Sequence, residues 1–143
     1  MVRSDSAGFS LIELLMVVTI IGIIASIAVP NLLRSKAAAN ETVAISYMRS
    51  WSAAQELYHT NHGRYADAEY QLFDEGLIDG HNPVDSHGYT FSLDNPPGSK
   101  YTWWGRASPD IPGETGTRWF FIDQTGVIRG SMSGAVNSNS PPL

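Results

Sequence analysis

The first long pattern in the chain is a stretch from Phe9 to Val29 that is almost entirely apolar, with Glu13 as its one ionisable residue. A helix of about 21 residues rises roughly 30 Å, which matches the hydrocarbon thickness of a bilayer. The pattern therefore predicts a helix that can cross a membrane. Arg34 and Lys36 follow the stretch, and this charge bias, taken alone, favours a cytoplasmic location for the residues after it.

The same stretch has an alternative interpretation as the hydrophobic region of a cleaved secretory signal, with Ser26-Ile27-Ala28 as the cleavage site. Such regions usually span about 7 to 15 residues and follow a positively charged cluster. This stretch is longer, and the segment before it has one Arg3 against one Asp5. These features favour a retained helix over a cleaved signal.

A second helical pattern follows Pro30, whose ring and missing amide would break or kink a helix. Apolar residues recur there at spacings of three, four and seven and form one stripe: Leu33, Ala37, Ala44, Tyr47, Met48, Trp51, Ala54 and Tyr58. The charged residues that flank the stripe are Arg34, Lys36, Glu41, Arg49 and Glu56. We expect this helix to end at Asn61 or His62, because Gly63 suits the position after a helix end.

The pattern changes to a period of two after a connection over residues 64–87, in which one short helix is expected near Ala68 to Glu75. The expected strands lie around Tyr89 to Leu93, Lys100 to Ala107, Arg118 to Asp123 and Val127 to Arg129. In the second of them, Tyr101 and Trp103 should point to the same side.

These elements predict an α+β fold, in which a long N-terminal helix packs its apolar stripe on a three- or four-stranded antiparallel sheet. The helix has a membrane half and an amphipathic half. Residues 131–143 lack an apolar period and are expected to form a flexible tail.

Composition narrows the classes of function. The chain has 143 residues, nine Lys plus Arg, a formal net charge of -5 and no cysteine. So few basic residues provide no patch for a nucleic-acid backbone, and nucleic acid is therefore not an expected partner. The lack of cysteine excludes disulfides, thiolate zinc sites and cysteine nucleophiles.

Glu13 is the unusual residue of the apolar stretch. A carboxylate within a membrane helix costs about 2.5 to 3.5 kcal/mol on insertion scales unless it lies near the interface or is paired. Two interpretations stay open at this point. Either Glu13, which lies one turn into the stretch, reaches the lipid headgroups, or it is a functional intramembrane acid.

The residues around Glu13 read Gly8-Phe9-Ser10-Leu11-Ile12-Glu13, and here the sequence resembles the type IV pilin family, including the pseudopilins of type II secretion. The resemblance implies that a prepilin peptidase cuts between Gly8 and Phe9 and methylates the new amino group of Phe9. It also implies that Gly22 and Pro30 loosen the helix. The leader has one basic residue, whereas leaders of this family are usually richer in them.

The later part of the chain also resembles this family, because the pilin fold has a long N-terminal helix, a variable connection and an antiparallel sheet. The stretch WFFIDQTGVIR is similar to the terminal hairpin of G-type pseudopilins. The expected organisation is a leader at 1–8, a transmembrane or filament-core helix at 9–30, an amphipathic helix at 31–63, a head at 64–130 and the tail at 131–143.

The chemistry of such a cut can be derived from the residues. Cleavage after Gly8 gives Phe9 a cationic amine, and Glu13 lies four residues later on the same helix face. An amine of one helix and the carboxylate of its neighbour would pair only at one axial stagger. The costly charge would therefore fix the axial offset between neighbouring helices. Gly22 and Ser26 are small and four apart, so helices can approach closely there.

No catalytic constellation emerges from the remaining residues. Histidine and aspartate gather near the end of the long helix and in the loop after it, at His59, His62, Asp79, His81, Asp85 and His87. Their spacing does not match a metal motif, and a solvated loop explains them better. The same holds for calcium ligation by Asp110, Glu114 and Asp123. We therefore expect neither an enzyme nor a bound metal or cofactor.

The aromatic residues of the helix and the strands have the spacing of a core. Trp103 and Trp104 are adjacent, so on a strand they face opposite sides, and the exposed one is the best candidate for a contact with a subunit or partner.

The combined prediction is a pilin-like structural subunit. Its expected partners are copies of itself or related pilins, the prepilin peptidase, the inner-membrane assembly machinery and membrane lipid. The precursor is expected in the bacterial inner membrane with its C-terminal part outside the cytoplasm, and the assembled subunit in a surface pilus or periplasmic pseudopilus. The alternative is a secreted or membrane-tethered binding domain.

Overall fold

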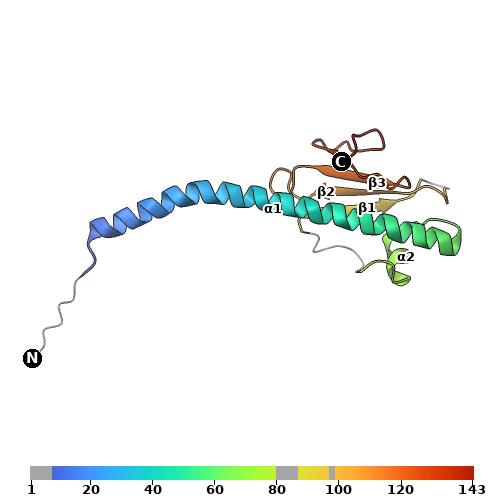
Figure 1. Ribbon diagram of the computed structural model, residues 1–143, viewed down its shortest axis with the longest axis horizontal. Coiled ribbons are helices and arrows are strands. Elements are labelled where there is room, and N and C mark those ends of the chain that lie inside the picture. The colour runs from blue at the N-terminus through green and yellow to red at the C-terminus, as the bar shows by residue number, and fades with distance from the viewer. Residues whose placement is uncertain (1–7, 80–86, 97–98) are drawn as a thin grey trace, which may run out of the picture. The chain divides into compact units, whose positions relative to one another are not determined.

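The computed structural model describes residues 8–79, 87–96 and 99–143. Two helices precede four strands (Figure 1): α1 (Leu11–His62), α2 (Glu69–Asp74), β1 (Tyr89–Asp94), β2 (Trp104–Pro109), β3 (Trp119–Asp123) and β4 (Arg129–Ser131). This order confirms the α+β class. The chain divides into two compact units, Met1–Ser35 and Lys36–Leu143, which are described separately below.

The first unit consists mainly of the apolar part of α1. Its large apolar side chains, from Leu11 to Leu33, are 45% to 80% exposed, on all sides of the helix. This is the one helix among the described residues that is long and apolar enough to cross a membrane. The helix runs on through Pro30, which cannot donate a hydrogen bond to the Ser26 carbonyl.

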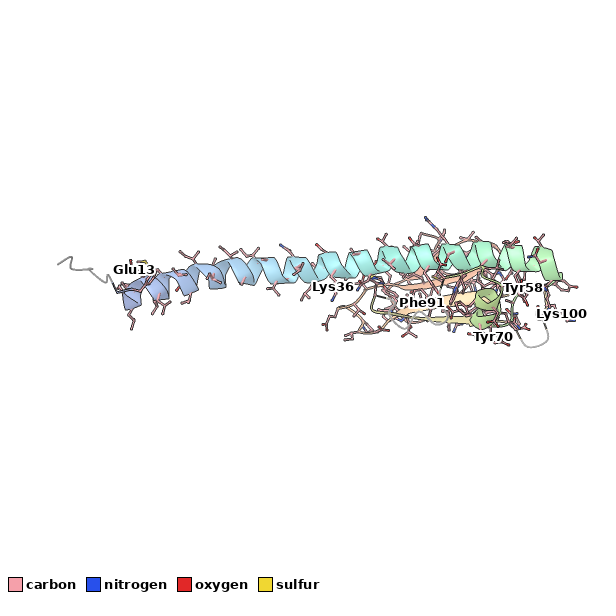
Figure 2. All side chains as sticks on the ribbon, turned by 90° about the horizontal axis from the view of Figure 1, so that it is seen from below. Glu13, Lys36, Tyr58, Tyr70, Phe91 and Lys100 are labelled. Atoms are coloured by element: carbon pink, nitrogen blue, oxygen red, sulfur yellow. The ribbon has the colours of Figure 1, made fainter. Side chains whose placement is uncertain are left out.

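The second unit is an antiparallel sheet in the order β1-β2-β3-β4, covered on one face by the later part of α1. The helix also buries Asn40, Glu41 and Gln55, which the predicted stripe did not include, whereas Leu33 of the stripe is 45% exposed. The buried apolar residues of the stripe include Met48 and Trp51, which are fully buried. They pack against Tyr89, Phe120 and Ile122 of the sheet. The Phe91 ring of β1, labelled in Figure 2, lies with its centroid 4.8 Å from that of Tyr47.

One glycine lets the helix approach the sheet closely. A Cβ built on Gly105 of β2 would lie 2.9 Å from Cε3 of Trp51 and 3.2 Å from Cγ2 of Ile122. No other residue type fits here without a shift of the surrounding core. The large indole of Trp51 is therefore accommodated by the absence of a side chain opposite it.

The end of α1 is as predicted. Gly63 follows the helix with a φ of 68°, and its N–H donates to the His59 carbonyl at 2.8 Å. Glycine adopts this left-handed conformation without the steric cost that other residues incur. The short helix of the connection is also present as α2, and Gly76 comes two residues after its last residue with a φ of 67°.

The predicted start of the second strand is wrong. β2 begins at Trp104 and not at Lys100. Trp103 is fully buried, whereas Tyr101 is 68% exposed, so the two do not share a side as expected. The cause is local hydrogen bonding: the Ser99 and Thr102 hydroxyls lie 2.7 Å apart, and the Lys100 carbonyl accepts from the Tyr65 N–H. These contacts keep the segment out of the ladder.

The segment after β4, expected from its composition to be a flexible tail, lies against β4 in the structure. The Gly130 N–H donates to the Pro141 carbonyl at 3.1 Å, and the Leu143 N–H donates to the Ile128 carbonyl at 3.1 Å. Val136 is buried. Figure 1 shows the C-terminus beyond β3, at the edge of the sheet opposite β1, in agreement with the bridge between Arg129 and Pro142. Backbone pairing needs no apolar period, which is why composition gave no sign of it.

Candidate functional site

The start of α1 is built as a capping box around two polar side chains. The Ser10 N–H donates to Oε2 of Glu13 at 2.9 Å. In return, Oγ of Ser10 accepts from the N–H of Ile12 at 3.3 Å. Ser10 directly precedes the helix and Glu13 is its third residue, so the two side chains satisfy two backbone donors that the helix itself cannot. Figure 2 marks Glu13 near this end of α1.

This arrangement gives Glu13 a role that neither open interpretation included. Its carboxylate caps the helix and lies at the positive end of the helix dipole. The chain here is continuous through Gly8 and Phe9, so the Phe9 nitrogen is an uncharged peptide amide. Before any cleavage the partner of Glu13 is therefore the Ser10 amide. The serine three residues before the glutamate was the sequence signal for this contact.

The two glycines of the candidate site have no packing reason within the chain. A Cβ built on Gly8 or on Gly22 would meet no atom within 4 Å. Glycine inside a helix costs about 1 kcal/mol relative to alanine, so Gly22 weakens α1 without any gain in this chain. Packing within the described chain therefore does not require glycine at either position. Phe9 is 81% exposed and equally free of internal packing.

A second polar cluster ties α1 to the loop between β2 and β3. Glu41 is 6% exposed. Its Oε1 accepts the N–H of Thr117 at 2.8 Å and the Thr117 hydroxyl at 2.7 Å, and its Oε2 pairs with Nε of Arg118 at 2.8 Å. Next to it, Nδ2 of Asn40 donates to the Thr115 carbonyl at 2.7 Å. The loop is thus fixed to the helix by two consecutive side chains.

This cluster corrects the expectation that Glu41 only flanks the apolar stripe, because Glu41 is buried on the stripe's own face. Glu41 lies four residues after Ala37 and three before Ala44, so its position was on the buried face from the start. Burial raises the pKa of the Glu41 carboxyl, but the hydrogen bonds from Thr117 and the adjacent Arg118 outweigh burial, and the net pKa is lowered. A buried glutamate is stable here because each carboxylate oxygen has a donor.

The candidate metal ligands are dispersed or engaged in other contacts. Nε2 of His62 lies 3.1 Å from Oε1 of Glu75, while the His59 ring stacks on Tyr65. His81 and Asp85 lie outside the described residues. Asp110 accepts the Thr90 hydroxyl. Within the described ranges no three His, Asp or Glu side chains are placed to share a metal ion.

The family model described as the prokaryotic N-terminal methylation motif matches residues 3–29. Gly8, Phe9, Glu13 and Gly22 all lie within the matched residues, and Pro30 is the residue directly after them.

The chain is similar to proteins whose names refer to type IV pili and to type II secretion. The type IV wide pilus major component PilA4 of Thermus thermophilus is 38% identical over 73 residues, which are 51% of this chain and 56% of the relative. The type II secretion system core protein G of Pectobacterium carotovorum is 37% identical over 65 residues, 46% of this chain and 42% of the relative. The type IV major pilin PilA of Myxococcus xanthus is 40% identical over 60 residues, 42% of this chain and 27% of the relative.

The similarity to each relative is partial, because the matched part is about half of this chain and about half or less of each relative. The motif and the relatives confirm the resemblance to type IV pilins and pseudopilins that the sequence predicted. The α+β arrangement of α1 on a four-stranded antiparallel sheet is likewise pilin-like.

Proposed function

We propose that the chain is a structural subunit of a type IV pilus or a type II secretion pseudopilus. The observation that carries the proposal is the methylation motif at the start of α1, whose large apolar side chains from Leu11 to Leu33 are all exposed in the single chain. Apolar surface on every side of a helix is stable only in lipid or among other helices. The membrane that holds the precursor provides the lipid, and the core of the helical filament then provides the neighbouring helices.

Processing would convert the N-terminal end into a charged site. Hydrolysis of the Gly8–Phe9 peptide bond by a prepilin peptidase leaves a carboxylate on Gly8 and a free amine on Phe9, to which the same enzyme transfers a methyl group from a methyl-donor co-substrate. In the uncut chain Glu13 bonds to the Ser10 amide. After the cut, a cation lies one residue before Ser10, and the carboxylate acquires a stronger partner.

The new amine supplies a register for assembly. Between neighbouring helices, the Phe9 amine of one copy pairs with Glu13 of the next only at one axial offset, because any other offset leaves both charges unpaired in an apolar core. Gly22 permits close approach of the helices, since nothing in its own chain occupies the space beside it. Pro30, which lacks an amide, weakens α1 at a second point.

The partners and the location follow from this proposal. The precursor resides in the bacterial inner membrane, with the second unit outside the cytoplasm, and it contacts lipid, the peptidase and the assembly machinery. The assembled subunit contacts copies of itself or related pilins. The chain acts by assembly and not by catalysis.

The N-terminus of the mature protein tests the proposal directly. Mass spectrometry of membrane and sheared surface fractions should show a chain that begins at methylated Phe9. A chain that begins at Val29 would instead indicate a cleaved secretory signal. A chain that still begins at Met1 would indicate a tethered binding domain, and either result would overturn the proposal.

A further inference from the structure

The peptide bond that a prepilin peptidase would cut lies just outside α1. The helix begins at Leu11, and the exposed residues Gly8, Phe9 and Ser10 precede it without helical structure (Figure 1). Among the residues that the structure describes, none forms a hydrogen bond with the Gly8 carbonyl or the Phe9 N–H. Both polar groups of the Gly8–Phe9 peptide are therefore open to another molecule.

The backbone hydrogen bonds show what an earlier helix start would do to this peptide. The Leu14 N–H donates to the Ser10 carbonyl at 3.2 Å, and each N–H of an α-helix donates to the carbonyl four residues before it. If the helix began two residues earlier, the Ile12 N–H would donate to the Gly8 carbonyl. That carbonyl belongs to the bond to be cut, so growth of α1 toward Gly8 would close the bond into the helix.

The Ser10 hydroxyl competes directly with this growth. Its Oγ accepts the Ile12 N–H at 3.3 Å, which is the donor that the Gly8 carbonyl would need. The Glu13 carboxylate accepts a different donor, the Ser10 N–H. Of the two side chains of the capping box, it is therefore the hydroxyl of Ser10 that keeps the scissile carbonyl free.

Packing within the described chain does not hold Gly8 and Phe9 outside the helix. A Cβ built on Gly8 would meet no atom within 4 Å, and Phe9 is 81% exposed. Glycine is also an acceptable residue at the N-cap position, which Gly8 would occupy in the longer helix. The balance between the extended and the helical form of this segment therefore depends on the cap at Ser10.

We propose that Ser10 is a positioning residue for processing, because its hydroxyl makes α1 begin after the cut site. Proteolysis requires a chain segment that is extended and accessible. In the hydrolysis, water adds to the Gly8 carbonyl carbon, the bond to the Phe9 nitrogen breaks, and a Gly8 carboxylate and a Phe9 amine are formed. Ser10 acts through Ile12 and does not touch the reacting atoms. This inference rests on the proposed function, because it requires a prepilin peptidase as the enzyme.

Cleavage kinetics of the full-length precursor with a purified prepilin peptidase test this role. Ser10→Thr and Ser10→Val have nearly the same shape, but only threonine keeps the hydroxyl. If a helical form competes with the cleavable form, KM rises while kcat is unchanged, since only part of the substrate is competent to bind. We expect Ser10→Val to raise KM about fivefold and Ser10→Thr to stay within about twofold of the wild type.

Two further variants separate the hydroxyl from side-chain size and from general effects on α1. Ser10→Ala is smaller than the wild type and lacks the hydroxyl, so it should raise KM as Ser10→Val does. The matched control is Thr19→Ala, which removes a hydroxyl that donates to the Leu15 carbonyl further along the same helix. This control should leave KM and kcat unchanged, because the Thr19 hydroxyl is remote from the cut site.

A spectroscopic measurement observes the scissile peptide without the enzyme. Gly8–Phe9 is the only Gly-Phe step in the chain. Stable-isotope labels on the glycine carbonyl carbons and the phenylalanine nitrogens therefore single out the Gly8 carbonyl in the NMR spectrum of the precursor in detergent micelles. Its chemical shift should move to that of a hydrogen-bonded helical carbonyl in Ser10→Val and stay at the wild-type position in Ser10→Thr.

The outcomes separate the inference from the proposed function. If the peptidase cuts the wild type, and Ser10→Val has the KM and the carbonyl shift of Ser10→Thr, the inference is overturned and the function stands. A rise in KM for Ser10→Thr and Ser10→Val but not for Ser10→Ala would show that the enzyme reads side-chain size, which also overturns it. So would a lower kcat at unchanged KM. A wild-type precursor that is not cut after Gly8 overturns both.

Discussion

Glu13 and Ser10 are joined by a hydrogen bond at the start of α1, in which the Ser10 N–H donates to the Glu13 carboxylate at 2.9 Å. The Ser10 hydroxyl accepts a further bond from the Ile12 N–H at 3.3 Å. The acid is thus fixed in place before processing creates its proposed ionic partner at Phe9. A carboxylate that is already ordered loses less side-chain entropy when it pairs with the amine of a neighbouring copy.

The residue before the cut should control processing. We expect Gly8→Val to leave a precursor of full length in the membrane, because the resemblance to prepilins implies a residue without a side chain at the scissile bond. Nothing in the chain opposes the substitution, since a Cβ at Gly8 meets no atom within 4 Å. Mass spectrometry of the membrane fraction gives the answer, and mature protein of normal mass from this variant would contradict it.

The second unit should fold without the first. A fragment that begins at Lys36 contains the whole core cluster and all four strands, so its helix stripe is covered by its own sheet. We expect a soluble monomer with a mixed helix and strand circular dichroism spectrum and cooperative melting. Unfolded or helix-associated fragments would show that the stripe needs a neighbouring chain.

Glu41 should make the stability of this fragment depend on acid. Its pKa is below the ordinary value of 4.5, so the charged form contributes stability above about pH 4.5, and this contribution is lost as the pH falls through the lowered folded-state value. The free energy of unfolding of the wild type should therefore fall more steeply in that range than that of Glu41→Gln.

The size of that contribution can be measured at neutral pH. Glu41→Ala removes the acceptor of three hydrogen bonds from Thr117 and Arg118, and we expect a loss of about 2 to 3 kcal/mol in urea unfolding. Glu56→Ala, at an exposed helix position that holds only the Tyr65 hydroxyl, is the control and should lose less. Equal losses would show that the cluster does not anchor the loop.

Gly105 should resist substitution because of Trp51. Gly105→Ala places a methyl group 2.9 Å from the indole, and overpacking of this kind typically costs about 1 to 3 kcal/mol. Gly113→Asn is the contrasting variant, because that glycine has a φ of 87° and no atom within 4 Å of a built Cβ. The substitution there strains the backbone but does not overpack the core. Urea unfolding of both fragment variants measures their free energies of unfolding. An unchanged free energy of unfolding in Gly105→Ala would mean that the helix can shift freely on the sheet.

The sequence predicted the elements of this fold better than their polar contacts. The stripe from Ala37 to Tyr58 has a strict helical period, so both its buried face and its end before Gly63 could be read directly. Glu41 lies on the same face, but a charged residue is normally placed outside a core. Its burial depends on Thr117 and Arg118, which are more than seventy residues away in the chain.

The strands show the same limit. Alternation correctly separated Trp103, which is fully buried, from the half-buried Trp104. The start of β2 could not be predicted, because it is set by hydroxyl contacts of Ser99 and Thr102 in the preceding segment. At the candidate site, the sequence predicts the motif around Glu13, and the spacing of Ser10 and Glu13 is also that of a capping box, a contact that the sequence prediction did not include.

The most direct measurement compares sheared surface protein with membrane-bound protein for the wild type, Glu13→Ala and Glu13→Gln. Glutamine can still accept the bond of a capping box, so Glu13→Gln keeps the helix start and removes only the charge. Membrane insertion should be intact in both variants, and easier by up to about 3 kcal/mol if the acid is fully immersed.

Assembly should fail in both variants, because the buried Phe9 amine loses its carboxylate, and breaking such a pair costs about 3 to 5 kcal/mol per subunit. Abundant mature subunits in the membrane without surface filaments are the predicted result. Normal filaments from Glu13→Gln, with a defect confined to Glu13→Ala, would show that the glutamate only caps the helix and would contradict its role in setting the register.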